Sequence, residues 1–246
     1  MEDCIRFSHV TKKYGELTVL DDLSLSIAQG EFLTIIGRSG CGKTTALRLI
    51  NGLLSPDEGS ISVLGEDVSK ADIIALRRSV GYAIQSVGLF PHMTVAKNIA
   101  YVPSLSKLWK KQETDNNVKE LLNIVGLDES IAKRFPHQLS GGQQQRVGIA
   151  RALAAKPGIL LMDEPFGAVD EITRRSLQQE MLRLHKELGL TIVFVTHDIK
   201  EAMFLGSKML IMDSGRIAQL DTPENILKNP ANDFVKELVN HENSLK

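Results

Sequence analysis

Three features are missing from this sequence: a cysteine framework, an excess of charge of one sign and a long hydrophobic run. The two cysteines, Cys4 and Cys41, lie far apart, which is typical of a protein from a reducing compartment. The formal net charge is −1, so nothing global indicates a nucleic-acid partner. Apolar runs such as residues 159–162 and 192–195 are far shorter than the ~20 residues of a bilayer-spanning helix.

The N-terminus also lacks the features of a targeting segment. Its first five residues contain no basic region and no apolar run, so the sequence predicts no signal peptide. We therefore expect a cytosolic chain whose role at a membrane, if it has one, comes through a partner. What is present is the composition of an ordinary globular protein, in a chain of 246 residues that is long enough to bury a sizeable core.

Short apolar runs alternate with helical patterns along most of the chain. The strand candidates are residues 31–36, 80–84, 159–162, 191–195 and 209–212. Apolar residues recur at helical spacing in 44–53, 119–125 and 143–155. This alternation predicts a parallel sheet with crossover helices.

Other parts of the chain depart from the alternation. Shorter strands joined by turns are expected at residues 4–10, 19–27 and 59–63, where they would form an antiparallel layer. Residues 86–155 are mostly helical, and two short helices are expected near 224–228 and 232–239. The predicted fold is therefore α/β, with an N-terminal antiparallel β layer and an inserted α-helical subdomain.

A glycine-rich loop follows the strand candidate at 31–36 and precedes a predicted helix. It fits the Walker A pattern G-x-x-x-x-G-K-[ST] with Gly37, Arg38, Ser39, Gly40, Cys41, Gly42, Lys43 and Thr44. Glycines let backbone N–H groups converge on phosphate oxygens, and the helix adds its positive end. Lys43 supplies charge to the β- and γ-phosphates, and the Thr44 hydroxyl is a ligand for Mg²⁺. The alternative, a glycine-rich turn with a chance lysine, is disfavoured by the strand–loop–helix context.

Two carboxylates end the apolar strand at 159–162. Asp163 is expected to meet Mg²⁺ at the carboxyl end of the strand, where α/β sheets place their ligands. Glu164 is expected to hold the attacking water as a general base. A strand end with solvated acids is the alternative, and the Walker A loop makes it the weaker interpretation.

A second candidate anion site is the LSGGQ segment before the helix at 143–155. It consists of Leu139, Ser140, Gly141, Gly142 and Gln143. Its hydroxyl and N–H groups lie at a helix N-terminus, which favours an anion. One nucleotide does not need two such sites from one chain, so this one is expected to serve the γ-phosphate held by another copy. Ser140 as an ordinary N-cap is a compatible interpretation.

The Walker A loop, the LSGGQ segment, the two carboxylates and a histidine at 197 follow one another along the chain in the order of the ATP-binding-cassette (ABC) ATPases, and the sequence resembles that family from about residue 3 to residue 240. The resemblance implies a P-loop NTPase fold with a RecA-like parallel sheet core. It also implies roles for Tyr14 on the adenine, Gln85 at Mg²⁺ and the attacking water, and His197 at the γ-phosphate. Asp170 matches the D-loop aspartate, which crosses a dimer interface. A surface aromatic and a capped strand end are the alternatives for Tyr14 and His197.

For two residues of the Walker A loop, Arg38 and Cys41, the sequence predicts specific side-chain properties. Arg38 departs from the family pattern, in which this position is often proline, and its side chain is expected to point outward. Cys41 lies beside a helix N-terminus and Lys43, which favours a reactive thiolate, and a small residue that merely fits the loop is the alternative. We expect Thr45, the next residue after the loop, to bind ATP with it.

The resemblance also implies a domain organisation and partners. A single ABC nucleotide-binding domain covers 1–246, with its core in 1–85 and 156–222, a helical subdomain in 86–155 and a helical tail in 223–246. ATP and Mg²⁺ are the implied cofactors. A second copy, integral-membrane permease subunits and, indirectly, a solute-binding protein are the implied partners, at the cytoplasmic face of a bacterial-type membrane.

The amino-acid sequence of several segments resembles that of the osmoprotectant, or quaternary-amine, importer ATPases. These segments are 82–95, 98–103 and 164–174. That family handles glycine betaine, carnitine and choline. Many members continue into paired CBS modules, whereas this sequence ends at Lys246. The apolar and aromatic residues after Gln85, including Leu89, Phe90, Met93 and Trp109, are candidates for docking a permease helix. Packing inside the helical subdomain is the alternative.

Other functions stay open from the sequence alone. The chain fits an importer ATPase for another small solute, such as an amino acid, and also a soluble ABC-type ATP switch. A P-loop kinase is disfavoured by the LSGGQ segment.

Overall fold

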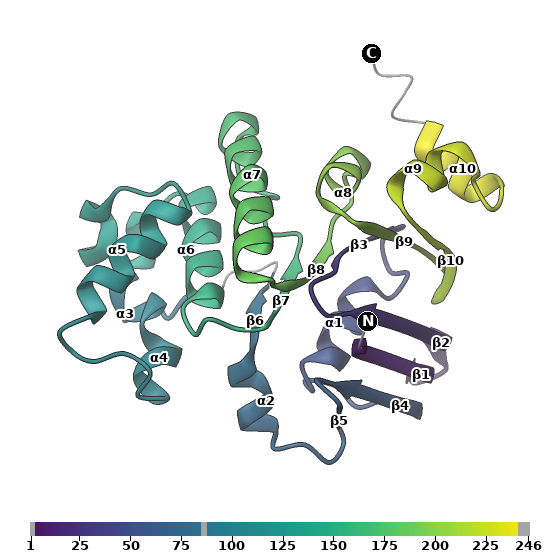
Figure 1. Ribbon diagram of the computed structural model, residues 1–246, viewed down its shortest axis with the longest axis horizontal. Helices are drawn as coiled ribbons and strands as arrows, with labels where there is room; N and C mark the ends of the chain where they lie inside the picture. Colours follow the sequence, from purple (N-terminus) through teal and green to yellow (C-terminus); the bar gives the residue numbers. More distant parts are fainter. Residues whose placement is uncertain (1–2, 85–87, 241–246) are drawn as a thin grey trace. The chain divides into compact units, whose positions relative to one another are not determined.

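The apolar runs of the sequence form strands in the structure, a computed structural model that describes residues 3–84 and 88–240. Contacts between elements divide the chain into two units. The first contains Met1–Arg77 and Gly189–Lys246, and the second contains Arg78–Leu188. Figure 1 labels the helices and strands of both.

The first unit contains the predicted antiparallel layer. Its strands are β1 (Asp3–Tyr14), β2 (Leu17–Ala28), β4 (Glu58–Val63) and β5 (Glu66–Asp67), in the order β2-β1-β4-β5. Leu23, Leu25 and Ile27 are buried between exposed neighbours, as expected for a sheet with one covered face. β1 and β2 are longer than predicted, because their exposed ends continue to pair up to Tyr14 and Leu17.

The first unit also contains parallel strands. β3 (Phe32–Gly37) pairs in parallel with β8 (Thr191–Val195) and with β9 (Lys208–Asp213). Every residue of β8 is buried, which is typical of a strand covered on both faces. β10 (Arg216–Asp221) pairs antiparallel with β9. The sequence did not predict β10, because its half-buried residues form no apolar run.

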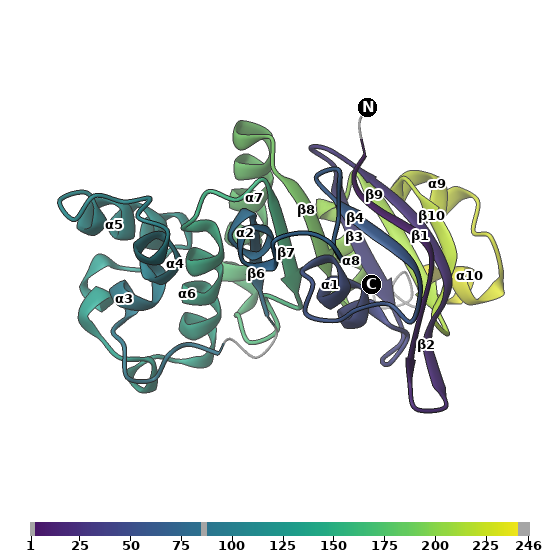
Figure 2. The same ribbon diagram turned by 90° about the horizontal axis from the view of Figure 1, so that it is seen from below.

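Helices of the first unit cover these strands. They are α1 (Lys43–Ile50), α8 (Ile199–Leu205), α9 (Pro223–Lys228) and α10 (Asp233–Asn240), and the short α2 (Ile73–Ser79) spans the boundary between the units. One hydrophobic cluster joins α8, α9 and α10 to β3 and β9. Figure 2 shows α9 and α10 beside β9 and β10. The two predicted tail helices are thus present, and they pack on the core strands.

The second unit contains two parallel strands and most of the helices. β6 (Val80–Ala83) pairs with β7 (Ile159–Asp163). The helices are α3 (Val95–Ile99), α4 (Tyr101–Leu105), α5 (Thr114–Ile124), α6 (Gly141–Leu153) and α7 (Glu171–Leu188), with short 3-10 turns at Glu129–Lys133 and Pro136–Gln138. The predicted helical character of the middle of the chain is therefore present.

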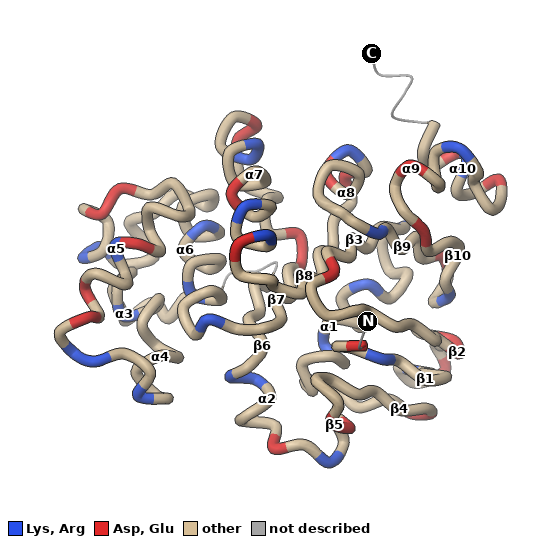
Figure 3. Tube along the Cα trace, viewed as in Figure 1, with Lys and Arg blue, Asp and Glu red and all other residues tan. Residues whose placement is uncertain are grey.

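Charges of both signs are interspersed along the two units (Figure 3). This agrees with the balanced composition and with a solvated surface. Among residues 3–84 and 88–240, no helix is both long enough and apolar enough to cross a membrane.

Candidate nucleotide-binding site

The glycine-rich loop lies between β3 and α1, at the carboxyl end of a buried parallel strand. A Cβ on Gly37 would lie 2.2 Å from the Met212 carbonyl oxygen, and one on Gly42 would lie 2.6 Å from the Leu20 side chain. Gly42 also has a φ of 102°, which favours glycine. Gly42 is the N-cap of α1 and makes no side-chain cap hydrogen bond, so the N-terminus of this helix lies at the loop. This arrangement suits a phosphate.

Lys43 places a buried ammonium at the same loop. Its Nζ donates hydrogen bonds to the carbonyl oxygens of Gly37 and Arg38, at 2.8 and 3.0 Å. The residue is only 8% exposed. Both acceptors are neutral, so the positive charge remains to attract an anion. The loop therefore combines a backbone that only glycine permits, a helix N-terminus and a cation, which suit the phosphates of a nucleotide.

The structure brings His197 to the same edge of the sheet as the loop. Ile35 of β3 pairs with Val195 of β8, and the Thr196 N–H continues the ladder to the Ile35 carbonyl oxygen at 3.2 Å. Gly37 and His197 each lie two residues beyond this pair. Since the strands run in parallel, both project from the same carboxyl end.

Hydrogen bonds between buried polar side chains shape the turn that contains His197, and the sequence did not predict them. Thr196 and Glu201 are both buried, and the Thr196 hydroxyl donates to a Glu201 carboxylate oxygen at 2.5 Å. Asp198 caps α8 by accepting from the Lys200 and Glu201 N–H groups. The available signal was an acidic residue three positions after a helix-capping aspartate, the spacing of a capping box.

Tyr14 lies on the hairpin that borders the loop. It is 46% exposed at the end of β1, and the Lys12 ammonium lies 5.9 Å from its ring centroid. Farther along the same hairpin, the Val19 carbonyl oxygen would be 2.8 Å from a Cβ on Gly42. An exposed ring on this hairpin is compatible with stacking on a base, and the role of Tyr14 stays a prediction.

In the second unit, Asp163 and Glu164 follow the buried strand β7 as predicted. Asp163 is 3% exposed and ends the strand, and Glu164 is half-buried. Glu164 has a φ of 47°, a left-handed conformation that costs a non-glycine residue on the order of 1–3 kcal/mol. Backbone strain of this kind concentrates at functional sites, which agrees with the predicted role of this carboxylate.

The LSGGQ segment forms a capping box at the start of α6. The Ser140 hydroxyl accepts from the Gln143 N–H at 3.2 Å, and the Gln143 side-chain oxygen accepts from the Ser140 N–H at 3.0 Å. The ordinary N-cap interpretation of Ser140 is therefore confirmed. It leaves the hydroxyl hydrogen of Ser140 and the N–H groups of Gly141 and Gly142 for an acceptor. Capping and anion binding are compatible at this helix end.

The D-loop packs against the start of α6 within the second unit. The Ala168 N–H donates to the Gln145 side-chain oxygen at 2.8 Å, a contact that the sequence did not reveal. Asp170 accepts from the Thr173 N–H at 3.0 Å, at the start of α7. This bond is the main cause that lowers the pKa of Asp170, so the group is ionised at neutral pH. Asp170 thus has a structural role in its own chain beside the predicted role in trans.

The two glycines of the signature segment have different surroundings, which predicts different tolerance to alanine. A Cβ on Gly142 would lie 2.8 Å from the Ala168 carbonyl oxygen, whereas one on Gly141 would lie 3.7 Å from the Ala168 Cβ. Gly142→Ala should displace the D-loop and lower steady-state phosphate release by about tenfold or more, since small misplacements near chemistry are costly. Gly141→Ala is the matched control and should fall less. Equal losses in the two variants would contradict the steric explanation.

Gln85 lies outside the described residues, so its predicted role stays a prediction. The neighbouring segment is organised by Asn98, which is fully buried. Its side-chain oxygen accepts from the Phe90 N–H at 2.8 Å, and its amide donates to the Phe90, Met93 and Thr94 carbonyls. The Phe90 ring lies 4.6 Å from that of Tyr101. Phe90 therefore packs inside the subdomain, and permease docking at this stretch stays a prediction.

Cys41 does not have the environment expected of a thiolate. It is buried, and this burial raises the pKa of the Cys41 thiol, with Lys43 lowering it by a smaller amount. The expectation of an activated thiolate is therefore wrong. We predict that iodoacetamide alkylates Cys41 in the folded chain about tenfold or more slowly than in denaturant at neutral pH, and faster as pH rises above ~8.5. Peptide mass spectrometry measures this directly, and equal rates in the two states would contradict it.

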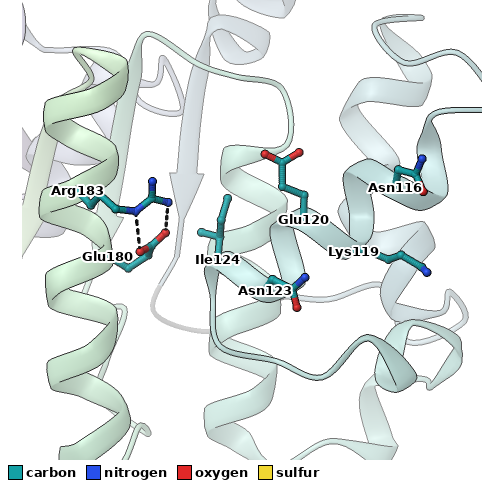
Figure 4. A pocket seen from close by; sticks show the side chains of 7 residues that line it. All are labelled: Asn116, Lys119, Glu120, Asn123, Ile124, Glu180 and Arg183. Atoms are coloured by element: carbon teal, nitrogen blue, oxygen red, sulfur yellow. Dashed lines mark hydrogen bonds and ion pairs between the residues drawn. The ribbon is translucent and has the colours of Figure 1, made fainter.

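A separate open cavity of about 570 Å³ lies between α5 and α7. Figure 4 shows its lining, in which Arg183 is paired with Glu180 and Lys119 points outward. None of the predicted site residues lines it. The features that suit a phosphate, in the described part of the chain, therefore lie at the loop after β3 and not among the residues that line this cavity.

Within each unit the predicted residues gather as expected. The glycine-rich loop, His197 and the hairpin of Tyr14 lie together in the first unit, and residues 163–170 lie beside the LSGGQ helix in the second. A phosphate cradle between a parallel strand and a helix, with acidic residues at the end of another strand, defines a P-loop nucleoside triphosphatase.

Comparisons with known proteins give the family. The ABC transporter family matches residues 20–167. The glycine betaine uptake system ATP-binding protein YehX of Escherichia coli (strain K12) is 52% identical over 95% of this chain and 75% of its own length. The carnitine transport ATP-binding protein OpuCA of Listeria monocytogenes serotype 1/2a is 52% identical over 96% of this chain and 59% of its own length. This chain therefore spans about three fifths to three quarters of these relatives.

Similarity to solved structures indicates the same family. The dimeric post-hydrolysis state of the ATP-binding cassette MJ0796 bound to ADP and Pi matches with a TM-score of 0.85 at 35% identity, over 89% of this chain and 98% of that one. The chain belongs to the ABC transporter family, as one of its ATP-binding, ATP-hydrolysing subunits. This confirms the predicted resemblance and fold class.

Proposed function

We propose that this ABC ATPase drives an importer for a quaternary amine such as glycine betaine, carnitine or choline. The observation that carries the proposal is the 52% identity, over 95% and 96% of the chain, to proteins named for glycine betaine uptake and carnitine transport. A Bacillus subtilis relative named for glycine betaine, carnitine and choline transport is 48% identical over 97% of the chain. Identity this high over nearly the whole chain supports the same class of system.

In this proposal the residues of the predicted site have separate roles. The loop at 37–44 and Thr45 hold the ATP phosphates, with Lys43 as the cation and Tyr14 against the adenine. Thr44, Gln85 and Asp163 hold Mg²⁺, which when bound neutralises phosphate charge. Three protein ligands are enough for this ion, because Mg²⁺ keeps waters and substrate phosphates in its coordination shell. Glu164 accepts the proton of the attacking water, and His197 contacts the γ-phosphate.

Two copies of the chain act together in the proposed cycle. The hydroxyl of Ser140, the N–H groups of Gly141 and Gly142 and the residue Gln143 cap the nucleotide of the other copy, with Asp170 at the interface. Two-fold symmetry gives each copy both half-sites. Closure then depends on ATP, because the nucleotide forms part of the interface. The dimeric state of the matched solved cassette supports this arrangement.

The proposed partners are permease subunits in the membrane, which hold the chain at the cytoplasmic face. A solute-binding protein or domain would select the solute outside. These partners would recognise the quaternary ammonium, so no residue of the ATPase needs to contact it.

Transport measurements in the source organism test the proposal. Cells that lack this chain should lose uptake of labelled glycine betaine, carnitine or choline, and the native chain should restore it while the Glu164→Gln variant should not. Sulfate uptake is a useful control, since a sulfate/thiosulfate import ATP-binding protein of Pseudomonas aeruginosa is 45% identical over 98% of the chain. Loss of sulfate or amino acid uptake instead would reassign the solute. An ATPase activity that never responds to a permease would support a soluble switch.

A further inference from the structure

The loop residue Arg38 contacts the C-terminal helix α10. Its guanidinium carbon lies 4.8 Å from the centroid of the Phe234 ring. This is within the ~6 Å range in which a cation is attracted to an aromatic face. The side chain leaves the loop, as the sequence predicted, but it leaves toward a defined partner.

The ring of Phe234 is itself held in place. Phe234 is half-buried and packs against a hydrophobic cluster to which α10 contributes Val235 and Val239. The same cluster includes Ile36, the residue of β3 directly before the loop. The aromatic face that Arg38 meets is therefore fixed to the strand from which the loop emerges, and both ends of the contact belong to the first unit.

Arg38 is also the residue whose backbone shapes the loop. Its carbonyl oxygen accepts from Lys43 Nζ at 3.0 Å and from the Cys41 N–H at 3.3 Å. A side chain that is held at its far end restricts the backbone of its residue. The contact with Phe234 thus restrains the carbonyl that orients Lys43, the cation of the loop.

We propose that Phe234 is a positioning residue for the phosphate-binding loop, and that through Arg38 the C-terminal helix α10 raises the affinity of the loop for nucleotide phosphates. The physical reason is pre-organisation, because a loop already held in its binding geometry loses less conformational freedom when the ligand binds. This inference rests on the proposed function of the loop in holding ATP.

A double-mutant cycle on the full chain tests the proposal, with the dissociation constant of Mg-ADP measured by titration calorimetry. Phe234→Leu keeps an apolar side chain on the cluster but removes the ring, and it should raise the dissociation constant about two- to fivefold, the range of a surface cation–π contact. In the Arg38→Ala background, the same substitution should have no further effect. Phe234→Tyr retains the ring and should bind as the native chain does.

Leu238→Ala is the matched structural control. Leu238 lies one turn after Phe234 on α10 and packs on the same cluster. Its truncation should lower the melting temperature and leave the dissociation constant unchanged. The proposal is overturned if Phe234→Leu binds like the native chain, if its effect persists without Arg38, or if Leu238→Ala weakens binding equally.

Lys43→Met separates this inference from the function on which it rests. If Lys43→Met loses affinity while Phe234→Leu does not, only the positioning role fails. If Lys43→Met binds Mg-ADP as tightly as the native chain, the Lys43 ammonium does not act on the phosphates, and the role that the proposed function gives to Lys43 fails whatever the result for Phe234→Leu.

Discussion

Replacing Glu164 with glutamine is expected to lower ATP turnover by about 10²–10⁴-fold, the usual contribution of a general base. Glutamine keeps the size of the side chain and removes its capacity to take a proton from the attacking water. The strained backbone of Glu164, with a φ of 47°, is held by the end of β7 and by the turn in which the Gly167 N–H meets the Glu164 carbonyl at 3.3 Å. This turn does not depend on the side-chain charge, so the folded structure should persist. Steady-state phosphate release measures the loss.

The same variant should accumulate as a dimer in ATP, because the nucleotide that closes the interface is no longer hydrolysed. Size-exclusion chromatography with and without ATP measures this. Glu187→Gln is the matched control, since Glu187 is exposed in the same unit and pairs with Arg183 at the surface. It should keep native turnover. A Glu164→Gln chain that stays monomeric in ATP, or that hydrolyses ATP at the native rate, would refute the proposed mechanism.

Burial explains which strands were visible in the sequence. β8 (Thr191–Val195) was predicted at its observed limits, because all of its residues are buried and apolar or β-branched. β10 was missed, because an edge strand with half-buried polar residues has no apolar run. The outer parts of β1 and β2 were missed for a related reason. Their last pairs, such as Tyr14 with Leu17, are exposed and are held by the hairpin and not by the core.

Some features of the candidate site could likewise be predicted from the sequence, and others could not. Residues of contiguous motifs were predictable, because a loop such as 37–44 needs only local sequence to define its geometry. Contacts between distant residues were not, and the Arg38–Phe234 pair joins the two ends of the chain. The raised pKa of the Cys41 thiol likewise depends on burial, which the flanking residues do not reveal. Local charge patterns suggested the opposite shift.

Several motif residues have a structural bond in their own chain in addition to a predicted ligand. Ser140 caps α6, Asp170 bonds the first turn of α7, and Lys43 bridges two carbonyls of its loop. These bonds fix the side chains before a nucleotide arrives, which lowers the entropy cost of binding. An effect of mutation at such a residue therefore needs a stability measurement beside the activity measurement.

Lys43→Met applies this reasoning and should weaken ATP binding by about ten- to a hundredfold. The estimate follows from the ~1.5–3 kcal/mol of a hydrogen bond to a charged group. Methionine fills most of the buried volume of Lys43 and removes its charge. The Gly37 carbonyl loses its Lys43 donor, whereas the Arg38 carbonyl keeps the Cys41 N–H, so we also expect a loss of unfolding free energy of about 1 kcal/mol. Calorimetric titration and thermal melting measure the two effects separately.

The two effects distinguish a charge that binds from a charge that only supports the loop. Lys70→Met is the surface control, because Lys70 is exposed and its ion pair with Asp67 is a surface pair; it should change neither measurement. If Lys43→Met melts earlier but binds ATP as tightly as the native chain, the glycine backbone and the helix N-terminus suffice for the phosphates. The predicted role of Lys43 would then be wrong. A loss of affinity that exceeds the loss of stability means that its ammonium acts on the nucleotide itself.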